Sequence, residues 1–197
     1  MGLERLPRRK PITWPREIAM NRTSFMPPER PWTSSRRVLF TDFDGVLRRG
    51  QAYRTQNGIV SSHPSIQLFE FAHILAEAIA PYPELELVLS TSWVKALGFD
   101  RARDSLPLPL LRQRVKGATY HSRFYDRFAW NQIPRGEQIR RYVERHHLVK
   151  WLAIDDRDDG FDDAQSHLVH CDENLGLGDA TTQQILTRSL KAEFGRR

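Results

Sequence analysis

Residues 38–46, VLFTDFDGV, join a short apolar run to two aspartates and a glycine, and this stretch indicates the fold. The apolar run is typical of a buried strand, and alternation along a strand sends Asp42 and Asp44 to the same side. Gly45 lets the backbone turn out of the sheet without steric cost. Two carboxylates this close repel each other unless a cation or a shared proton intervenes. The pair indicates a metal site, or a nucleophile beside a proton-transferring acid, with a plain Asp-Gly turn as the simpler alternative.

The net charge of +6 belongs to one end of the chain. Residues 1–37 hold nine lysines and arginines against three glutamates, whereas the remaining 160 residues hold 21 basic and 21 acidic side chains. The basic segment is rich in proline and poor in aliphatic residues, so it buries too little apolar surface to offset its ordering entropy. We expect an extended arm over residues 1–37, which is either solvated or in contact with nucleic acid.

The sequence gives no sign of a membrane or secretory protein. Its longest apolar stretch falls short of the roughly 20 residues that a membrane helix needs, and the N-terminus lacks the apolar core of a signal peptide. The single cysteine, Cys171, excludes an internal disulfide framework. We expect a cytoplasmic protein without a membrane partner, and the sequence predicts no particular oligomeric state.

From residue 38 onward, strand patterns alternate with helix patterns. Such alternation predicts parallel strands covered on both faces, that is, a three-layer α/β/α sandwich with a mostly parallel, Rossmann-like sheet. The residues that follow the first strand, through 62, and residues 116–134 are predicted to be loops. Prolines at 107–111 interrupt the helical pattern that precedes them. Strands are predicted at 38–40, 85–89, 151–154 and 168–171, and helices at 63–79, 93–103, 136–147 and 180–190, the last capped by Asp179.

Three of the predicted strands end in side chains that can do chemistry. Residues 42–44 supply two acids, residues 90–91 supply two hydroxyls, and residues 155–156 supply two further acids. Functional residues of open parallel sheets gather beyond the carboxyl ends of the strands. The sequence therefore predicts one site at this edge of the sheet.

The order of these segments resembles the haloacid-dehalogenase-like (HAD) superfamily over roughly residues 37–190. DFDGV at 42–46 matches its first motif, LVLS at 87–90 its second, and IDD at 154–156 its fourth. A narrower similarity, to the small bacterial HAD domains associated with RNA-repair modules, rests on segments 89–93, 108–112, 117–119 and 174–177.

The resemblance implies a role for each motif. Asp42 would attack a phosphoryl group and form an aspartyl-phosphate, and Asp44 would protonate the leaving alcohol and then deprotonate the attacking water. Ser90 and Thr91 would bind the phosphoryl oxygens, helped by amides of the following helix.

The resemblance also implies a magnesium site. Asp155 would hold Mg²⁺, with Asp156 or Asp159 as the second acidic partner, and Asp42 and the main-chain carbonyl of Asp44 would complete the site. An all-oxygen ligand set suits Mg²⁺ better than zinc.

The third HAD motif supplies a lysine or arginine, and several residues compete for this role. Arg135 precedes a predicted helix that starts on the catalytic side of the sheet, whereas Lys150 lies at the far end of its strand, about 15 Å away. Arg140 and Lys116 are alternatives, and a surface arginine without a role is the simpler reading of Arg135.

We therefore expect residues 38–197 to form a HAD-like catalytic domain that performs Mg²⁺-dependent phosphomonoester hydrolysis. Only about 45 residues separate the first two motifs, which leaves no room for a large cap domain. An open site admits a bulky phosphorylated substrate, such as a nucleic acid end. The alternative is a non-catalytic or phosphotransfer module that binds nucleic acid through its basic arm.

Overall fold

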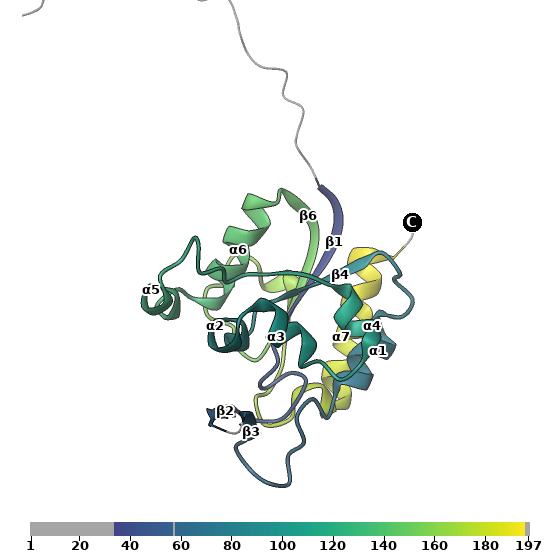
Figure 1. Cartoon of the computed structure of the whole chain (residues 1–197). Helices are drawn as coiled ribbons and strands as arrows, with labels where there is room; N and C mark the ends of the chain where they lie inside the picture. Colours follow the sequence, from purple (N-terminus) through teal and green to yellow (C-terminus); the bar gives the residue numbers. More distant parts are fainter. Residues whose placement is uncertain (1–33, 57, 196–197) are drawn as a thin grey trace, which may run out of the picture. The chain divides into compact units, whose positions relative to one another are not determined.

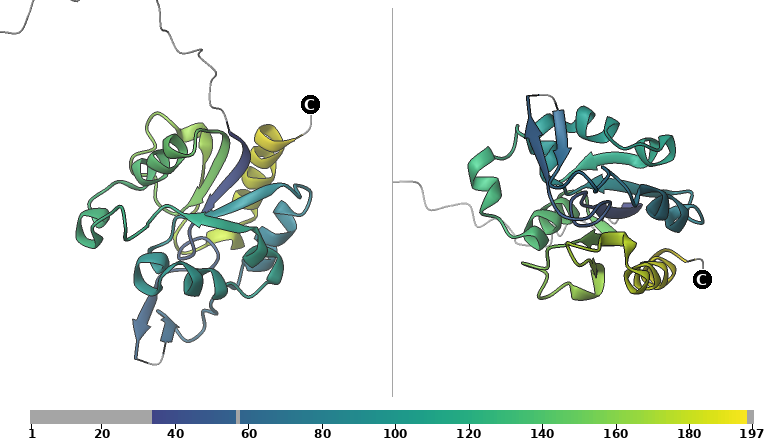
Figure 2. Two further views of the ribbon diagram at one scale, coloured as in Figure 1. Left: turned by 45° about the horizontal axis from the view of Figure 1, so that its top comes forward. Right: turned by 90° about the horizontal axis from the view of Figure 1, so that it is seen from below.

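A computed structural model of the protein describes residues 34–56 and 58–195, and its centre is a parallel β-sheet (Figure 1). Strand β1, the middle one, pairs in parallel with β4 and β6, and the sheet order is β5-β4-β1-β6-β7. Helices cover both faces of the sheet, as two further views show (Figure 2), which confirms the predicted three-layer, Rossmann-like fold. The strands are β1 (Ser34–Thr41), β4 (Leu85–Leu89), β5 (Val115–Ala118), β6 (Leu148–Asp155) and β7 (Leu168–His170).

The helices follow the strands in the alternating order that the sequence predicts. A small antiparallel hairpin lies between β1 and the first helix and consists of β2 (Ala52–Thr55) and β3 (Gly58–Ser61). The helices are α1 (Ala72–Ile79), α2 (Ser92–Leu97), α3 (Phe99–Asp104), α4 (Pro109–Arg114), α5 (Arg127–Asn131), α6 (Arg135–Arg145) and α7 (Ala180–Phe194), with short 3-10 turns at Gln165–His167 and Gly176–Gly178.

Alternation along β1 builds a separate core on each face of the sheet. Leu39 is fully buried in the larger core, which also contains buried residues of α1, α4 and α7. Val38 and Phe40 point to the other face, where they pack with Ile139 and Tyr142 of α6. Burying large apolar side chains contributes about 1.5–3 kcal/mol each, so β1 anchors the domain and fixes the position of the acids that follow it.

Two predicted helices differ from the structure because the backbone turns within them. The helix predicted from residue 63 begins only at Ala72, since residues 63–71 form turns and Phe69 adopts a left-handed φ of 59°. The Phe69 ring packs against the ring of Phe43, so tertiary packing overrides the local helical pattern. The helix predicted at 93–103 is split into α2 and α3 at Gly98, whose φ is 87°.

Both predicted loops contain structure, and β1 is longer than predicted. The hairpin lies within the first loop, and β5 and α5 lie within residues 116–134. Strand β5 is a short edge strand that pairs only with β4, and its residues show no apolar alternation from which it could be predicted. Strand β1 begins at Ser34, since Arg36 binds Glu86 and Arg37 donates to the Phe194 carbonyl. Residues 1–33 of the expected arm lie outside the described residues.

The region above the carboxyl end of the sheet carries no large insertion. Between β1 and α1 the chain adds only turns and the hairpin, and a large cap domain is absent from the described residues, as the sequence predicts. Among the described helices, none has the length and apolar character of a membrane-spanning segment.

Candidate active site

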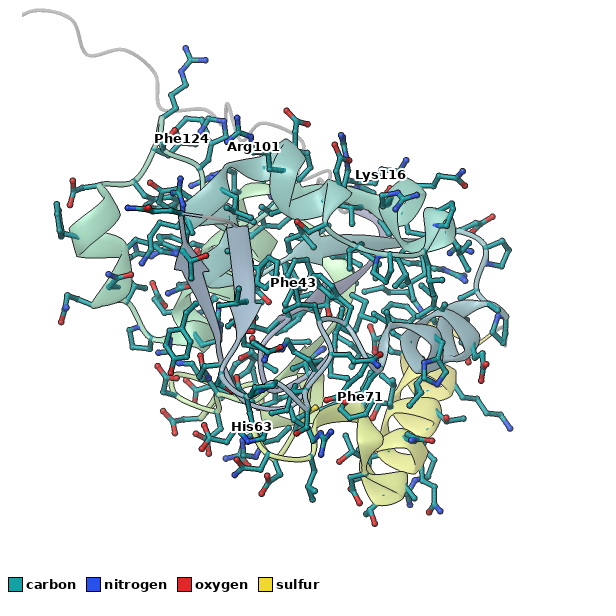
Figure 3. All side chains as sticks on the ribbon, turned by 60° about the horizontal axis from the view of Figure 1, so that its bottom comes forward. Phe43, His63, Phe71, Arg101, Lys116 and Phe124 are labelled. Carbon is teal, nitrogen blue, oxygen red and sulfur yellow. The ribbon has the colours of Figure 1, made fainter. Side chains whose placement is uncertain are left out.

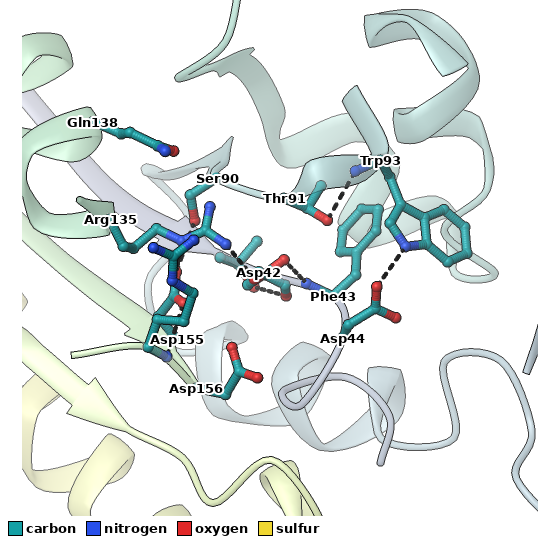
Figure 4. Close-up of polar contacts among 12 residues, drawn as sticks. Asp42, Phe43, Asp44, Ser90, Thr91, Trp93, Arg135, Gln138, Asp155 and Asp156 are labelled. Atoms are coloured by element: carbon teal, nitrogen blue, oxygen red, sulfur yellow. Dashed lines mark hydrogen bonds and ion pairs between the residues drawn. The ribbon is translucent and has the colours of Figure 1, made fainter. Parts of the chain in front are cut away.

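The sheet register brings the three predicted strand ends together. Thr41 pairs with Leu89 on one side and with Ile154 on the other. The residues that follow these three are Asp42, Ser90 and Asp155, so they lie side by side at the carboxyl edge, as Figure 4 shows. All three side chains are buried. Buried polar groups need partners, and the partners here define the chemistry of the site.

Arg135 is the cation of this cluster. Its Nη2 donates to Asp42 Oδ2 at 2.7 Å, and its Nε lies 3.1 Å from Asp155 Oδ2, an ion-pair distance without the alignment of a hydrogen bond. The Arg135 side chain is only 7% exposed. A buried guanidinium between two buried carboxylates offsets their mutual repulsion, and it points directly at the first acid of the DFD segment (Figure 4).

The start of α6 holds Arg135 in this position. Arg135 is the first helical residue, and its backbone N–H donates to Asp159 Oδ2 at 3.1 Å. Gly136 lies so close to the Gly160 carbonyl that a Cβ at position 136 would overlap it. The helix can therefore approach the loop after β6 only because residue 136 is glycine.

Three acids form the strongest candidate metal centre in the described part of the chain. Asp42, Asp155 and Asp156 each offer a carboxylate oxygen, and these oxygens lie within 4.8 Å of one another. Burial raises the pKa of Asp155 well above its ordinary value, and burial followed by the Asp42 charge raises that of Asp156 to about 6. Closely spaced carboxylates that ionise reluctantly are stabilised by a divalent cation.

These residues fit Mg²⁺, since the donors are all oxygen and the charge of Arg135 alone does not balance three carboxylates. Gly45 is part of the arrangement. Its φ is 68°, and a Cβ there would overlap the Asp156 carboxylate. The glycine after the DFD segment therefore makes room for the third acid.

Two of the predicted acidic ligands have other side-chain partners. Asp159, the alternative to Asp156, binds Arg157 and the backbone of Arg135 and is not one of the three clustered acids. The Asp44 carboxylate also lies outside the cluster and points toward Trp93 (Figure 4). Only the main-chain carbonyl of Asp44 remains a candidate for the metal.

Arg48 and Trp93 hold Asp44, and sequence reasoning missed both. Asp44 Oδ1 accepts a hydrogen bond from Arg48 Nη1 at 2.9 Å, and Oδ2 accepts one from Trp93 Nε1 at 3.0 Å. Arg48 is fully buried. Burial raises the pKa of Asp44 despite these two donors. The only available signal was the spacing of four residues between Asp44 and Arg48, which is common in any charged sequence.

The two hydroxyls after β4 have different surroundings. Ser90 Oγ faces Asp155 Oδ2 at 3.4 Å, a long and weak hydrogen bond that leaves the hydroxyl free to rearrange. Thr91 Oγ1 accepts from the backbone N–H of Trp93 at 3.3 Å and so caps α2. Both are buried at the edge of the site.

A comparison with protein-family models assigns the chain to a family. The model described as HAD domain in Swiss Army Knife RNA repair proteins matches residues 38–182, which is more than half of the chain. The protein belongs to this HAD family. A search of curated proteins finds no match. The family confirms the resemblance seen in the sequence, and it makes the domain a HAD-type hydrolase or phosphotransferase module.

Within the HAD domain, the candidate cations of the third motif occupy four different places. Arg135 alone among them contacts Asp42. Arg140 pairs with Glu137 on the exposed side of α6. Lys116 is exposed on β5, and Lys150 donates to the carbonyl of Glu193 near the amino end of β6.

Proposed function

We propose that this HAD domain is a Mg²⁺-dependent phosphomonoester hydrolase that works through an aspartyl-phosphate on Asp42. One observation carries the proposal: Asp42, at the end of the central strand, contacts a buried arginine and shares a cluster with two further acids. A purely structural aspartate would not need such a costly set of buried charges around it.

In the first step, an oxygen of Asp42 attacks phosphorus and the bond from phosphorus to the leaving alcohol oxygen breaks. The backbone N–H of Phe43 donates to Asp42 Oδ1 at 2.7 Å and fixes the carboxylate plane. Arg135 lies against the other oxygen and would stabilise the negative charge of the transferring phosphoryl group, and Ser90 would donate to one of its oxygens.

Asp44 would supply the proton that the leaving oxygen needs. In the second step it takes a proton from water, whose oxygen attacks phosphorus and releases inorganic phosphate and free Asp42. Burial raises the pKa of this carboxyl, which makes it easier to protonate. Trp93 and Arg48 keep the side chain beside the nucleophile rather than within the acidic cluster.

Asp42, Asp155 and Asp156 would hold Mg²⁺, assisted by the Asp44 carbonyl. When bound, the ion would offset the repulsion between the anionic substrate and the carboxylates.

The open edge of the sheet supports a bulky substrate. No large cap covers the site in the described residues, so a polymer end can reach it. The family is named for RNA repair proteins, and a phosphorylated RNA end carries the kind of phosphomonoester that the proposed reaction cleaves. We propose a phosphorylated nucleic acid end as the substrate.

The test is phosphate release from an aryl phosphate and from 3′- and 5′-phosphorylated oligonucleotides, with and without Mg²⁺. We expect Mg²⁺-dependent release by the natural chain and none by Asp42→Asn, while the exposed control Asp162→Asn keeps the activity. Equal activity of Asp42→Asn would rule out this mechanism. Transfer to an added alcohol instead of water would show a phosphotransferase, and no release from any substrate would favour the non-catalytic binding module.

A further inference from the structure

A groove lined by rings and cations lies beside β5, away from the acidic cluster. Its volume is about 640 Å³, and β5, the segment after it, α3 and the second half of α6 supply its walls. The rings include Tyr120, Phe124 and Tyr142, and the cations are Lys116 and Arg145. Phe124 and Lys116 lie on the same side of the domain in Figure 3. The reaction proposed above uses none of these side chains.

One ring of the groove is largely exposed, and another is buried in the wall. Phe124 is 60% exposed and lies next to His121, with 5.1 Å between the ring centroids. At the other wall, Tyr142 lies against His146 at 4.1 Å, and its hydroxyl reaches the backbone of β5 at Gly117, where a Cβ would meet it. A flat ring held at an open surface, as Phe124 is, is a platform on which another flat group stacks.

The cations of the groove are not balanced by neighbouring acids. Arg145 lies over the rings of Phe124 and Tyr125, at 4.9 and 5.4 Å, and donates to the Tyr125 hydroxyl. Neither Arg145 nor Lys116 has a carboxylate partner at ion-pair distance within the described residues. The one acid in the lining, Asp100, already pairs with Arg103 at 3.3 Å. The groove therefore offers positive charge to an anionic ligand.

One wall of the groove ends near the active site. Ala118 in its lining pairs with Leu89, the residue before Ser90. Along α6, Arg135 marks the active site, and Tyr142 and Arg145 follow about 10 and 15 Å further on at 1.5 Å per residue. This distance corresponds to a few nucleotides of an unpaired strand.

We infer that this groove binds unpaired nucleotides of a single-stranded RNA whose phosphorylated end lies in the active site. An exposed ring on which a base can stack, unbalanced cations for the phosphates and a volume suited to a nucleotide-sized ligand occur here together. A duplex keeps its bases stacked inside and cannot use such a groove. The placement of the phosphorylated end rests on the proposed hydrolase, whereas RNA binding by the groove does not. RNA, rather than DNA, follows from the family's occurrence in RNA repair proteins.

The test is the affinity of full-length protein for a fluorescent single-stranded oligoribonucleotide, measured by anisotropy in an Asp42→Asn background that blocks turnover. Phe124→Ala removes a ring of the groove, and Phe128→Ala removes a still more exposed ring that does not line it. We expect Phe124→Ala to weaken binding about 5- to 150-fold, the loss of one stacked base, and Phe128→Ala to change it less than about 2-fold. Both variants keep the basic N-terminal segment, so its contribution cancels.

A second pair of variants tests the charge. Arg145→Gln removes a groove cation, and Arg188→Gln removes an exposed arginine of α7. We expect Arg145→Gln alone to reduce the slope of log affinity against log salt by about 0.7, which a purely structural change would not do. Equal affinities within both pairs, or tighter binding of duplex RNA, of single-stranded DNA or of an acidic peptide, would overturn the inference. Binding that depends on Phe124 in a protein without phosphatase activity would support the groove while removing the proposed reaction.

Discussion

Replacing Arg135 by methionine should destabilise the domain far more than replacing any surface arginine. Its side chain is 7% exposed and lies 2.7 Å from Asp42 and 3.1 Å from Asp155. Methionine keeps much of the volume and removes the charge, so the buried carboxylates lose their compensating cation. Breaking a buried ion pair from one side costs about 3–5 kcal/mol.

This cost converts into a shift that is easy to measure. In a domain of this size, 1 kcal/mol corresponds to about 2–4 °C in Tm, so Arg135→Met should lower Tm by about 6–20 °C. The matched control is Arg140→Met on the same helix. Arg140 is 42% exposed and pairs with Glu137 near solvent, so its loss should cost less than about 1 kcal/mol.

Circular dichroism melting with and without Mg²⁺ completes the test. A divalent ion bound to the three acids supplies positive charge next to the missing guanidinium, so Mg²⁺ should raise Tm more in Arg135→Met than in the natural chain. If Arg135→Met and Arg140→Met melt within about 2 °C of each other, the carboxylates do not depend on Arg135, and the electrostatic account of the site is wrong.

Three further predictions follow from the same geometry. Asp156 has a pKa of about 6 in the folded state, so between about pH 4 and 6 it binds more protons in the folded than in the unfolded chain. The metal-free domain should therefore lose stability as pH rises through this window. The gain in Tm from Mg²⁺ should be small at about pH 5 and larger at about pH 7. Gly45→Ala should lower the free energy of unfolding in urea by at least about 1 kcal/mol, because φ at this position is 68° and the new Cβ overlaps Asp156. A calorimetric titration should show weaker Mg²⁺ binding, and unchanged binding would mean that Asp156 is no ligand. Trp93→Phe keeps the ring packing but leaves Asp44 Oδ2 without its donor, so the free energy of unfolding should fall by about 1–3 kcal/mol. The rate of phosphate release should fall as well, and full activity would show that Trp93 does not position Asp44 for the reaction.

The parts of the fold that could be predicted are those whose pattern is strong and local. Strands β1, β4 and β6 are apolar runs, each followed by polar residues, and parallel pairing then places their ends at one edge. Arg135 was predicted to lie near this edge because a helix that leads into a parallel strand starts there, and the structure places it against Asp42.

What could not be predicted depends on contacts between distant segments. Trp93 lies in segment 89–93, which resembles the RNA-repair HAD domains, but nothing in this segment shows that its indole reaches an acid 49 residues earlier. Strand β5 is too short and too polar to produce a period, since it is recognised only by its pairing with β4. The left-handed backbone at Phe69 interrupts the helical pattern of the sequence, because it places the Phe69 ring in the core.

The most direct test of the central claim is a search for phosphate on the protein itself. The domain is mixed with an aryl phosphate and Mg²⁺, quenched with acid during turnover, digested and analysed by mass spectrometry. The account predicts a phosphorylated peptide modified at Asp42 that requires Mg²⁺ and is absent from Asp42→Asn. Turnover without any phosphorylated Asp42, or phosphate on a different residue, would contradict it.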